Sequence, residues 1–227
     1  MTGLDIIYED EAVLVCYKPA GIATQTNRLA QQDMVSRLRN YRAGKGENPY
    51  IGLVHRLDQP VEGVMVFAKT PAAAADLSGQ VAGRTIGKKY YALSAKEQKM
   101  ARNGLLRDYL LFDKKANHTQ IVSPQTPNAK AAELEYRILA ETQEEIFFDI
   151  TLHTGRHHQI RAQLAHMGCP ILGDAKYGTG ESEGTQLALC SYQLTFAHPA
   201  TGERLQFEIA PRNPLFGSYI KKTIEKE

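Results

Sequence analysis

Cysteine is scarce in this chain, and its distribution argues against two kinds of small protein. The three cysteines, Cys16, Cys169 and Cys190, are scattered over 227 residues, and none forms a CxxC pair. An odd, dispersed set is typical neither of a disulfide framework nor of a cysteine zinc site. We therefore expect buried free thiols in a reducing cytosol.

Long apolar runs and a strong charge of either sign are also missing. No apolar run reaches the roughly 20 residues of a membrane-spanning helix, and the acidic start MTGLDIIYEDEA lacks the basic-then-apolar order of a signal peptide. The formal net charge is only +2, too mild to indicate nucleic-acid binding unless basic residues gather on one face. These features predict a soluble, cytoplasmic protein with no membrane partner.

What is present is a series of strand patterns with few helices between them. Helical patterns cover 33–42, 71–82, about 156–167 and about 214–223. Strand patterns cover a short stretch before the acidic turn near the start of the chain, then 12–17, 64–68, 88–95, 105–112, 132–141, 145–153 and a hairpin within 187–211. Because strands outnumber helices and arrive in consecutive runs, we predict an α+β fold with a largely antiparallel mixed sheet and flanking helices. The length and the absence of a separating linker predict one domain over 1–227.

The stretch GLVHRLDQPVEGVMVFAKT places Asp58 between a His-Arg-Leu triplet and a Gln-Pro turn. One interpretation is an aspartate that hydrogen-bonds its own backbone in the turn. The other is a nucleophilic or general-base carboxylate, which must be ionised and is therefore favoured by a nearby cation. Arg56, two positions earlier, would point to the same side of an extended segment.

The stretch LHTGRHHQIR places Arg156 and Arg161 at the start of a predicted helix, where Arg161 would project away from the apolar stripe. Three histidines in this stretch raise the alternative of a metal site: His153, His157 and His158. The Thr-Gly pair between the first and the second would break a helix, and no HExxH motif is present. We therefore expect no metal.

In the stretch GKKYY, two lysines, Lys88 and Lys89, precede Tyr90 and Tyr91. A plain strand would bury one tyrosine and expose the other, with the lysines in solvent. A phosphate-tracking surface interleaved with aromatic side chains is the alternative. The local sequence leaves both open.

Taken together, four segments occur in the order found in one enzyme family: VHRLDQPVEGVMVFAKT, KKYYAL, LHTGRHHQIRAQLAHMGCPILGDAKYG and LTFAHPATGERLQFEIAP. Over roughly residues 4–211 the chain resembles the RluA-type family of RNA pseudouridine synthases. HRLD, followed by TGRxHQIR and GxPIxGDxxYG, is the specific part of this resemblance.

The resemblance implies an isomerase with a central active-site cleft that detaches uracil from ribose, rotates it and rejoins it through carbon 5, without metal or cofactor. By position, Asp58 matches the catalytic aspartate, Tyr90 the active-site tyrosine, and Arg161 the arginine that pairs with the aspartate. Arg56 matches the residue that fills the space left by the flipped nucleotide. Further substrate-binding residues are expected at His55, Arg156, His158, Gln159, Lys88 and Lys89.

The chain departs from the family pattern HRLDxxTSG, because Val61 and Glu62 stand where threonine and serine are usual. Glu62 could point inward and raise the pKa of Asp58, or face solvent or a cation on the RNA side. The departure motivates an alternative function, a non-catalytic RNA-binding or RNA-folding factor on the same scaffold. A metal hydrolase that uses the histidines is a third.

The expected partner is structured RNA, either rRNA or tRNA, and the expected state is a monomer. Relatives often carry a separate small RNA-binding domain ahead of the catalytic region, and none is expected here. Substrate choice would then depend on loops of the catalytic domain, for which 24–50 and 96–117 are candidates because they are polar and rich in positive charge.

Overall fold

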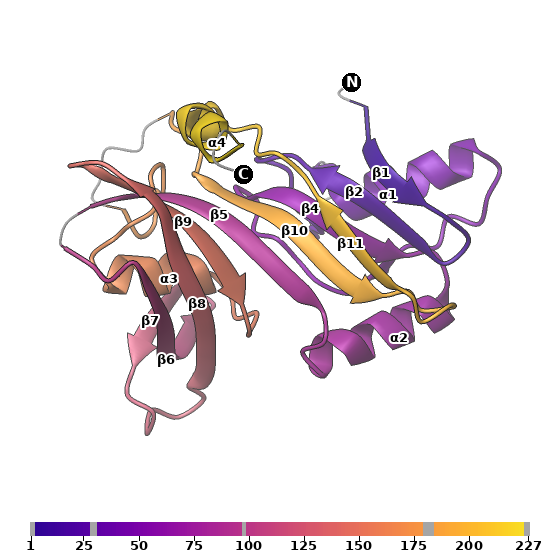
Figure 1. The fold of residues 1–227 in the computed structure, drawn as a ribbon. Coiled ribbons are helices and arrows are strands. Elements are labelled where there is room, and N and C mark those ends of the chain that lie inside the picture. The colour runs from indigo at the N-terminus through magenta and orange to yellow at the C-terminus, as the bar shows by residue number, and fades with distance from the viewer. Residues whose placement is uncertain (1–2, 28–30, 97–98, 179–183, 225–227) are drawn as a thin grey trace. The chain divides into compact units, whose positions relative to one another are not determined.

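The structure is a computed structural model that describes residues 3–27, 31–96, 99–178 and 184–224 (Figure 1). Parts of both loops proposed for substrate choice, 28–30 and 97–98, lie outside these ranges. The chain forms two compact units: unit 1 comprises Met1–Gly87 and Ser191–Ile209, and unit 2 comprises Lys88–Cys190 and Ala210–Glu227. The predicted α+β class is confirmed.

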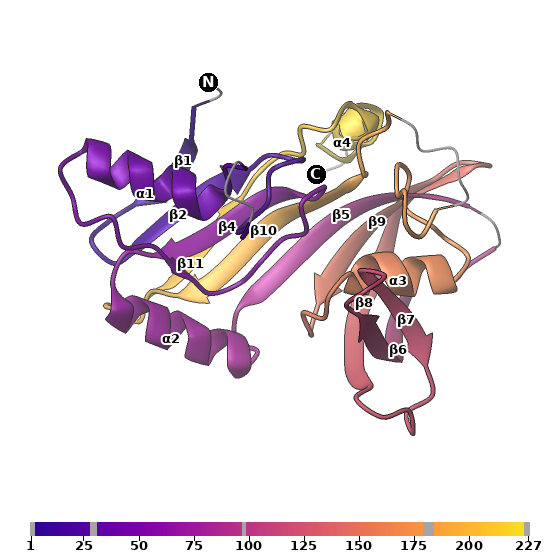
Figure 2. The same ribbon diagram turned by 180° about the vertical axis from the view of Figure 1, so that it is seen from behind.

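Unit 1 is built on a sheet in which β1, β2, β4 and β10 follow one another, with β3 paired to β4 and β11 to β10. Its elements are β1 (Asp5–Glu9), β2 (Val13–Lys18), α1 (Met34–Gly44), β3 (Gly52–Leu53), β4 (Glu62–Ala68), α2 (Pro71–Ala82), β10 (Leu189–Ala197) and β11 (Arg204–Glu208). The helix α2 packs against the face of the sheet that carries Val13, Val15 and Val66, and Figure 2 shows both helices of the unit.

Neighbouring strands and helices cover the two central strands of unit 1, β2 and β4, and most of their residues are apolar. Every residue of β2 and of β4 is buried. The two strands pair antiparallel from Val13 opposite Ala68 to Lys18 opposite Gly63. This register brings the end of β2 beside the start of β4, four residues after Asp58.

The helix α2 begins where the sequence predicts. The hydroxyl of Thr70 accepts a hydrogen bond from the backbone N–H of Ala73 at 3.1 Å, and Pro71 occupies the first helical position, where its missing N–H removes no intrahelical bond. Leu77 is fully buried in the core that the helix forms with β2 and β4. The cap and the apolar face together explain why the prediction was correct.

Unit 2 is an antiparallel sheet with the order β5-β9-β8-β6-β7. Its elements are β5 (Gly87–Ala95), β6 (Asn103–Asp113), β7 (His118–Val122), β8 (Lys130–Glu141), β9 (Glu145–Leu152), α3 (Gln159–His166), a 3₁₀ turn at Pro214–Phe216 and α4 (Gly217–Ile224). The helix α3 packs against β6 and β7, and its Ile160 and Leu164 are buried.

The structure differs from the sequence-based prediction in two details. The short strands β3 and β7 were not predicted, because neither carries a long alternating pattern. The helix α3 starts at Gln159, three residues later than expected, because His158 adopts a left-handed backbone conformation with φ of 50°. A helix cannot continue through such a residue.

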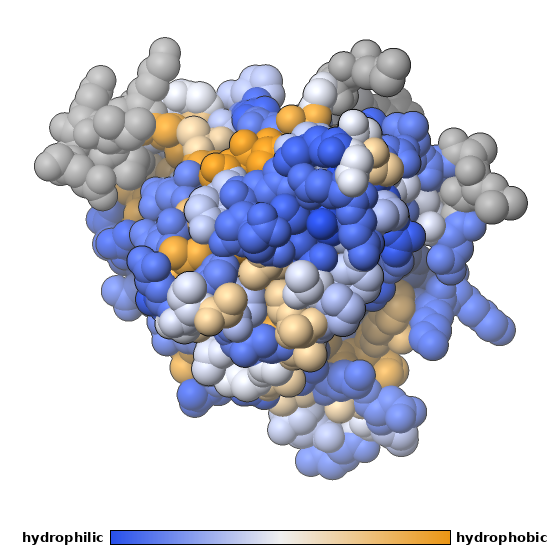
Figure 3. Space-filling model, turned by 90° about the vertical axis from the view of Figure 1, so that its right-hand side faces the viewer, coloured by the Kyte–Doolittle hydropathy of each residue, from blue (hydrophilic) through white to orange (hydrophobic). Residues whose placement is uncertain are grey.

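All three cysteines are buried thiols, as predicted. Burial, with a contribution from the negative charge of Asp5, raises the pKa of the Cys16 thiol to about 12. Within the described residues, no helix combines the length and the apolar character needed to cross a membrane. The face shown in Figure 3 is mostly hydrophilic, and hydrophobic side chains occupy only patches of it.

Candidate active site

Asp58 lies in the connection between β3 and β4, where its side chain is half-buried. The residues on either side of it are tied to the segment that follows β2. The hydroxyl of Thr24 donates to the carbonyl oxygen of Leu57 at 2.8 Å and accepts from the N–H of Leu57 at 3.2 Å. Gly21 and Gln59 exchange two further bonds, both 2.9 Å long.

Lys18 adds further hydrogen bonds to the backbone on both sides of this contact. Its ammonium group is fully buried and donates to three carbonyl oxygens, those of Pro19 at 2.9 Å, Ile22 at 2.7 Å and Gln59 at 3.2 Å. We call the contacts of Lys18, Gly21 and Thr24 with Leu57 and Gln59 the Asp58 clamp. It fixes the main chain immediately before and after the carboxylate.

The buried ammonium also bears on the charge of Asp58. Burial lowers the pKa of Lys18 to about 7, while the negative charges of Asp58 and Glu62 act in the opposite direction. The attraction is mutual, so a protonated Lys18 favours the ionised form of Asp58. The sequence indicated Arg56 as the nearby cation but not Lys18. A lysine at the end of an otherwise apolar strand gives no sign of its partners.

Arg56 and His55 differ in how firmly the structure holds them. Arg56 is exposed, and its guanidinium donates to the side-chain oxygen of Gln25 at 3.1 Å. His55 is half-buried, and its Nε2 accepts a hydrogen bond from the backbone N–H of Val66 in β4 at 3.2 Å. His55 therefore positions its own segment on β4, whereas Arg56 is exposed to an incoming ligand.

Glu62 points into the protein. It is 1% exposed, and its carboxylate accepts a hydrogen bond from the hydroxyl of Tyr17 at 2.5 Å. The alternative that it faces solvent or an RNA-side cation is therefore wrong. The sequence could not decide the matter, because a glutamate at the first position of a strand can face either side.

In unit 2, Arg161 is held by a second acid that the sequence reading did not single out. The guanidinium, 4% exposed, forms a bidentate pair with Asp174, with Nε at 2.8 Å from Oδ2 and an Nη at 2.6 Å from Oδ1. The ring of Tyr177 lies against it, with its centroid 5.1 Å from the guanidinium carbon. Both partners belong to the GDAKYG segment, and that segment was the available signal.

The sequence did not indicate that the side chain of Arg161 is buried against the turn that carries Asp174. Backbone N–H groups of Lys176 and Tyr177 donate to the same carboxylate at 2.9 Å and 3.2 Å. Asp174 therefore fixes both the turn and the arginine. The pairing of Arg161 with Asp58 stays a prediction.

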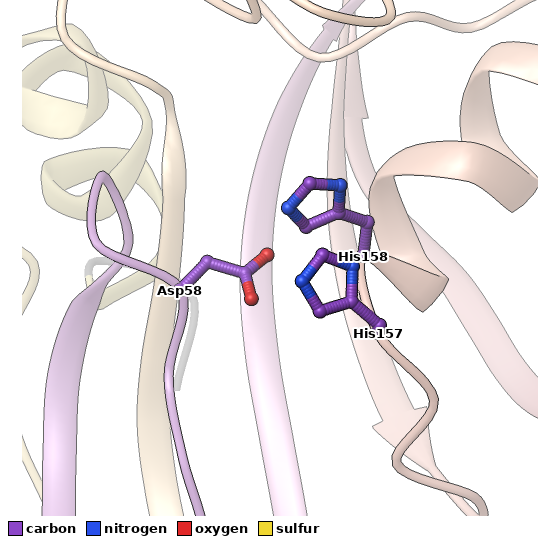
Figure 4. A group of neighbouring side chains, drawn as sticks. All are labelled: Asp58, His157 and His158. Atoms are coloured by element: carbon purple, nitrogen blue, oxygen red, sulfur yellow. The ribbon is translucent and has the colours of Figure 1, made fainter. Parts of the chain in front are cut away.

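His158 is a neutral imidazole inside unit 2. Its Nδ1 lies 2.9 Å from the hydroxyl of Tyr177, and burial, followed by the positive charge of Arg161, lowers its pKa to about 2. Figure 4 shows Asp58 on the segment that precedes β4, and His157 and His158 on the turn that precedes α3. A neutral ring offers a hydrogen bond but no charge to a phosphate.

Gln159 and Arg156 stabilise the turn that leads into α3. The side-chain oxygen of Gln159 accepts from the hydroxyl of Thr154 at 2.7 Å and from the N–H of Arg156 at 3.0 Å, while its amide donates to the carbonyl of Glu133 at 3.1 Å. The guanidinium of Arg156 donates to the carbonyl of Ala131 at 3.0 Å. These bonds shape the turn around His158.

Tyr90, Lys88 and Lys89 lie on β5, which pairs with β9 through Tyr90 opposite Ile150. Tyr90 is 5% exposed. Side chains alternate along a strand, so Lys88 shares the face of Tyr90 and Lys89 occupies the other. Burial lowers the pKa of Lys88. Its ammonium group lies close to Gly155, because a Cβ atom at that glycine would be 3.3 Å from the ammonium nitrogen. Lys88 thus lies beside the turn that precedes α3.

The three histidines considered as metal ligands have different neighbours within unit 2. The Nε2 of His153 lies 3.2 Å from the carboxylate of Glu135. The ring of His157 lies 3.9 Å, centroid to centroid, from the rings of both Phe112 and His158. His153 thus contacts a carboxylate, whereas His157 contacts aromatic rings.

Comparison with known proteins places this arrangement in a family. Solved structures of two human proteins, RNA Pseudouridylate Synthase Domain Containing 4 and Domain Containing 1, align with TM-scores of 0.76 and 0.75, covering 97% and 95% of this chain and 93% and 86% of theirs, at 24% and 20% identity. The fold is that of a pseudouridylate synthase domain.

The sequence model of the RNA pseudouridylate synthase family matches residues 12–166. The chain is 34% identical, over 90% of its length, to an uncharacterized RNA pseudouridine synthase of Bacillus subtilis, YhcT, and 32% identical, over 90%, to the ribosomal large subunit pseudouridine synthase D of Nitrosomonas europaea. The chain belongs to the RNA pseudouridylate synthase family, in its RluA-type branch. It spans 68% and 61% of the lengths of these two relatives.

Proposed function

We propose that this protein isomerises uridine to pseudouridine in structured RNA. The observation that carries the proposal is the family match over residues 12–166, a stretch that contains Asp58, Tyr90 and Arg161. The Asp58 clamp supports it, because a carboxylate that attacks a substrate gains from a fixed main chain and a nearby cation.

In this reaction the bond between uracil N1 and the ribose anomeric carbon breaks, and a bond between uracil carbon 5 and the same anomeric carbon forms. The proton on carbon 5 is released, and N1 takes up a proton. A stacked uridine cannot reach a protein carboxylate, so it must first be flipped out at a cost of a few kcal/mol. Arg56, exposed on the Asp58 segment, would occupy the space it leaves.

We assign three catalytic residues. Asp58 attacks the uracil ring or the anomeric carbon as an anion. Tyr90 stacks on the ring and assists removal of the carbon 5 proton. Arg161, oriented by Asp174, supplies positive charge that favours the anionic carboxylate. We further propose that residues 1–227 form one catalytic domain.

The residues expected to bind substrate divide by their contacts. Arg56, Lys88 and Lys89 carry cationic groups that can meet phosphates, which position RNA without specifying its sequence. His55, Arg156, His158 and Gln159 form hydrogen bonds within the protein, and we infer that they shape the surface on which the RNA rests.

The substrate we favour is large-subunit ribosomal RNA. Several relatives at 30–32% identity carry the name ribosomal large subunit pseudouridine synthase, C or D. We further propose a cytoplasmic monomer that acts without a metal. Transfer RNA is the alternative substrate, and the assay below distinguishes the two.

The proposal is tested by tritium release. Ribosomal RNA and tRNA, each labelled at uridine carbon 5 and purified from a strain lacking the gene, are incubated with the wild-type protein or with Asp58→Asn. Asp76→Asn, which alters an exposed aspartate on α2, serves as the matched control. We expect the wild type and Asp76→Asn to release tritium from ribosomal RNA, and Asp58→Asn to release none. Retention of all tritium by both RNAs with folded wild type contradicts the proposal and favours the non-catalytic RNA-binding alternative.

A further inference from the structure

The departure from the family pattern at Glu62 lies next to the Asp58 clamp. Glu62 opens β4, and Lys18 closes β2 opposite Gly63. Both side chains are buried, at 1% and 0% exposure. A glutamate at this position therefore adds a negative charge to the same enclosed region that holds the Lys18 ammonium.

The three acceptors of Lys18 require its protonated form. An ammonium group has three N–H donors, and the structure gives it three carbonyl oxygens, those of Pro19, Ile22 and Gln59. A neutral amine has only two donors, so its lone pair would face one of these oxygens. Because the side chain is fully buried, water cannot replace the lost bond, and the contact with Gln59, the longest of the three, is the one most easily given up.

Burial works against that protonated form. It lowers the pKa of Lys18 to about 7, and the two carboxylates that counteract it are Asp58, on the connection before β4, and Glu62, on β4 itself. Tyr17 adds a titratable hydroxyl that donates to Glu62, and from β1 Asp5 pairs with Tyr17 in the strand register. The charge of Lys18 thus depends on carboxylates in its own surroundings.

The proposed reaction removes one of these two charges. When a carboxylate oxygen of Asp58 bonds to the substrate, by addition to the uracil ring or by displacing uracil from the anomeric carbon, an electron pair and the negative charge pass to the uracil. Glu62 then remains as the protein carboxylate that favours the Lys18 ammonium. We propose that Glu62 is a positioning residue, whose buried carboxylate keeps Lys18 protonated and the Asp58 clamp closed throughout the reaction. This inference rests on the proposed function and adds a residue to its site.

Kinetics separate this role from a merely structural one. In Glu62→Gln, Lys18 should lose its proton at lower pH, by about one unit, given the usual effect of one nearby charge. We expect kcat for tritium release to fall about tenfold at pH 8 and to stay within about twofold of wild type at pH 5.5, with KM for the RNA unchanged. Tyr17→Phe removes the hydrogen bond to Glu62 but keeps its charge, so its pH profile should match the wild type.

Equal loss of kcat at both pH values in Glu62→Gln, or the same profile shift in Tyr17→Phe, overturns the proposal. A stability measurement provides a readout independent of RNA. The destabilisation caused by Glu62→Gln should be larger at pH 6, where Lys18 is charged, than at pH 9, and this difference should vanish in a Lys18→Met background. A destabilisation that is the same at both pH values and in both backgrounds also overturns it.

These measurements distinguish a failure of the proposed activity from a failure of the coupling between Lys18 and Glu62. If the wild type releases no tritium, the proposed function fails, while the stability cycle still tests the coupling of Lys18 and Glu62. If Glu62→Gln does not fold, Asp58→Asn provides the test, because it removes the charge of Asp58 without reaction. The ¹⁵Nζ resonance of Lys18 in that variant should remain that of an ammonium at pH 6, and a neutral amine at that pH would overturn the proposal.

Discussion

The Asp58 clamp in unit 1 and the Arg161 site in unit 2 position their functional groups in different ways. The clamp acts mainly on backbone groups, since Lys18, Gly21 and Thr24 all bond to main-chain atoms of Leu57 or Gln59. The Arg161 site depends on side chains, because Asp174 pairs with the guanidinium directly.

The difference shows where substitutions can be tolerated. Every residue supplies a backbone carbonyl, so a clamp built on carbonyls survives changes of the side chains it holds. The replacement of the usual Thr-Ser by Val61 and Glu62 occurs next to the clamp and leaves its contacts intact. A bidentate pair has no such freedom, since both its geometry and its charge balance come from two specific side chains.

The largest effect is expected at the residue that the clamp presents. Asp58→Asn keeps the shape of the side chain but removes the nucleophilic anion, and loss of a nucleophile typically costs about 10⁴-fold or more in kcat. Tritium release measures this loss, and thermal denaturation should show a midpoint within a few degrees of wild type. Residual activity above about one tenth would show that the clamp positions something other than the reacting group.

The next largest effect is expected at the Arg161 site, which depends on side chains. Asp174→Asn leaves the buried Arg161 guanidinium without its counter-charge, which should lower the free energy of unfolding by about 3–5 kcal/mol. Urea denaturation measures it. The control is Glu133→Gln, which breaks the exposed pair with Arg107 and should cost at most about 1 kcal/mol. Equal costs for the two variants would contradict the view that the buried Arg161 depends on Asp174.

A smaller effect is expected when one contact of the clamp is removed. Thr24→Val leaves the N–H and the carbonyl of Leu57 without their partner, which should cost about 1–3 kcal/mol of stability and lower kcat with little change in KM. Thr85→Val, which loses an exposed hydrogen bond to the carbonyl of Gln80, is the matched control. An unchanged kcat in Thr24→Val would show that the remaining contacts suffice to hold Asp58.

The smallest effect concerns pH. The pKa of His158 is lowered to about 2 in the folded protein but should be near 6.5 in the unfolded chain. Between these values the unfolded state binds more protons, so the free energy of unfolding falls as the pH drops below about 6.5. His158→Asn, which tolerates the left-handed backbone, should show a shallower decline between pH 7 and pH 5. Parallel curves would mean that His158 is not kept neutral.

The sequence predicted most of the fold because the local signals agreed with the packing. Thr70 and Pro71 marked the start of α2, and alternation marked β8 and β9. The strand β7 carried too few apolar residues to be recognised, and the start of α3 depended on a left-handed His158 that no local pattern indicates. Such features arise from tertiary contacts.

The candidate site divides in the same way. Asp58, Tyr90 and Arg161 could be singled out because they lie in segments that resemble the motifs of a known family, although their catalytic roles stay predictions. Lys18, Asp174 and the inward direction of Glu62 could not be assigned, because each depends on contacts between residues distant in sequence or on the face that a strand turns to the core. The sequence singled out the candidate catalytic residues but not the contacts that hold them in place.

The buried thiols have a practical consequence for all of these experiments. A thiol whose pKa is about 12, as for Cys16 in β2, carries almost no thiolate at neutral pH and does not react with alkylating reagents while it is enclosed. Cys16 belongs to unit 1 and Cys169 to unit 2, whereas Cys190 lies on β10, whose first two residues are assigned to unit 2 and the rest to unit 1. Mass-resolved alkylation under mild denaturant would therefore record the opening of each half of the protein separately, with no label introduced.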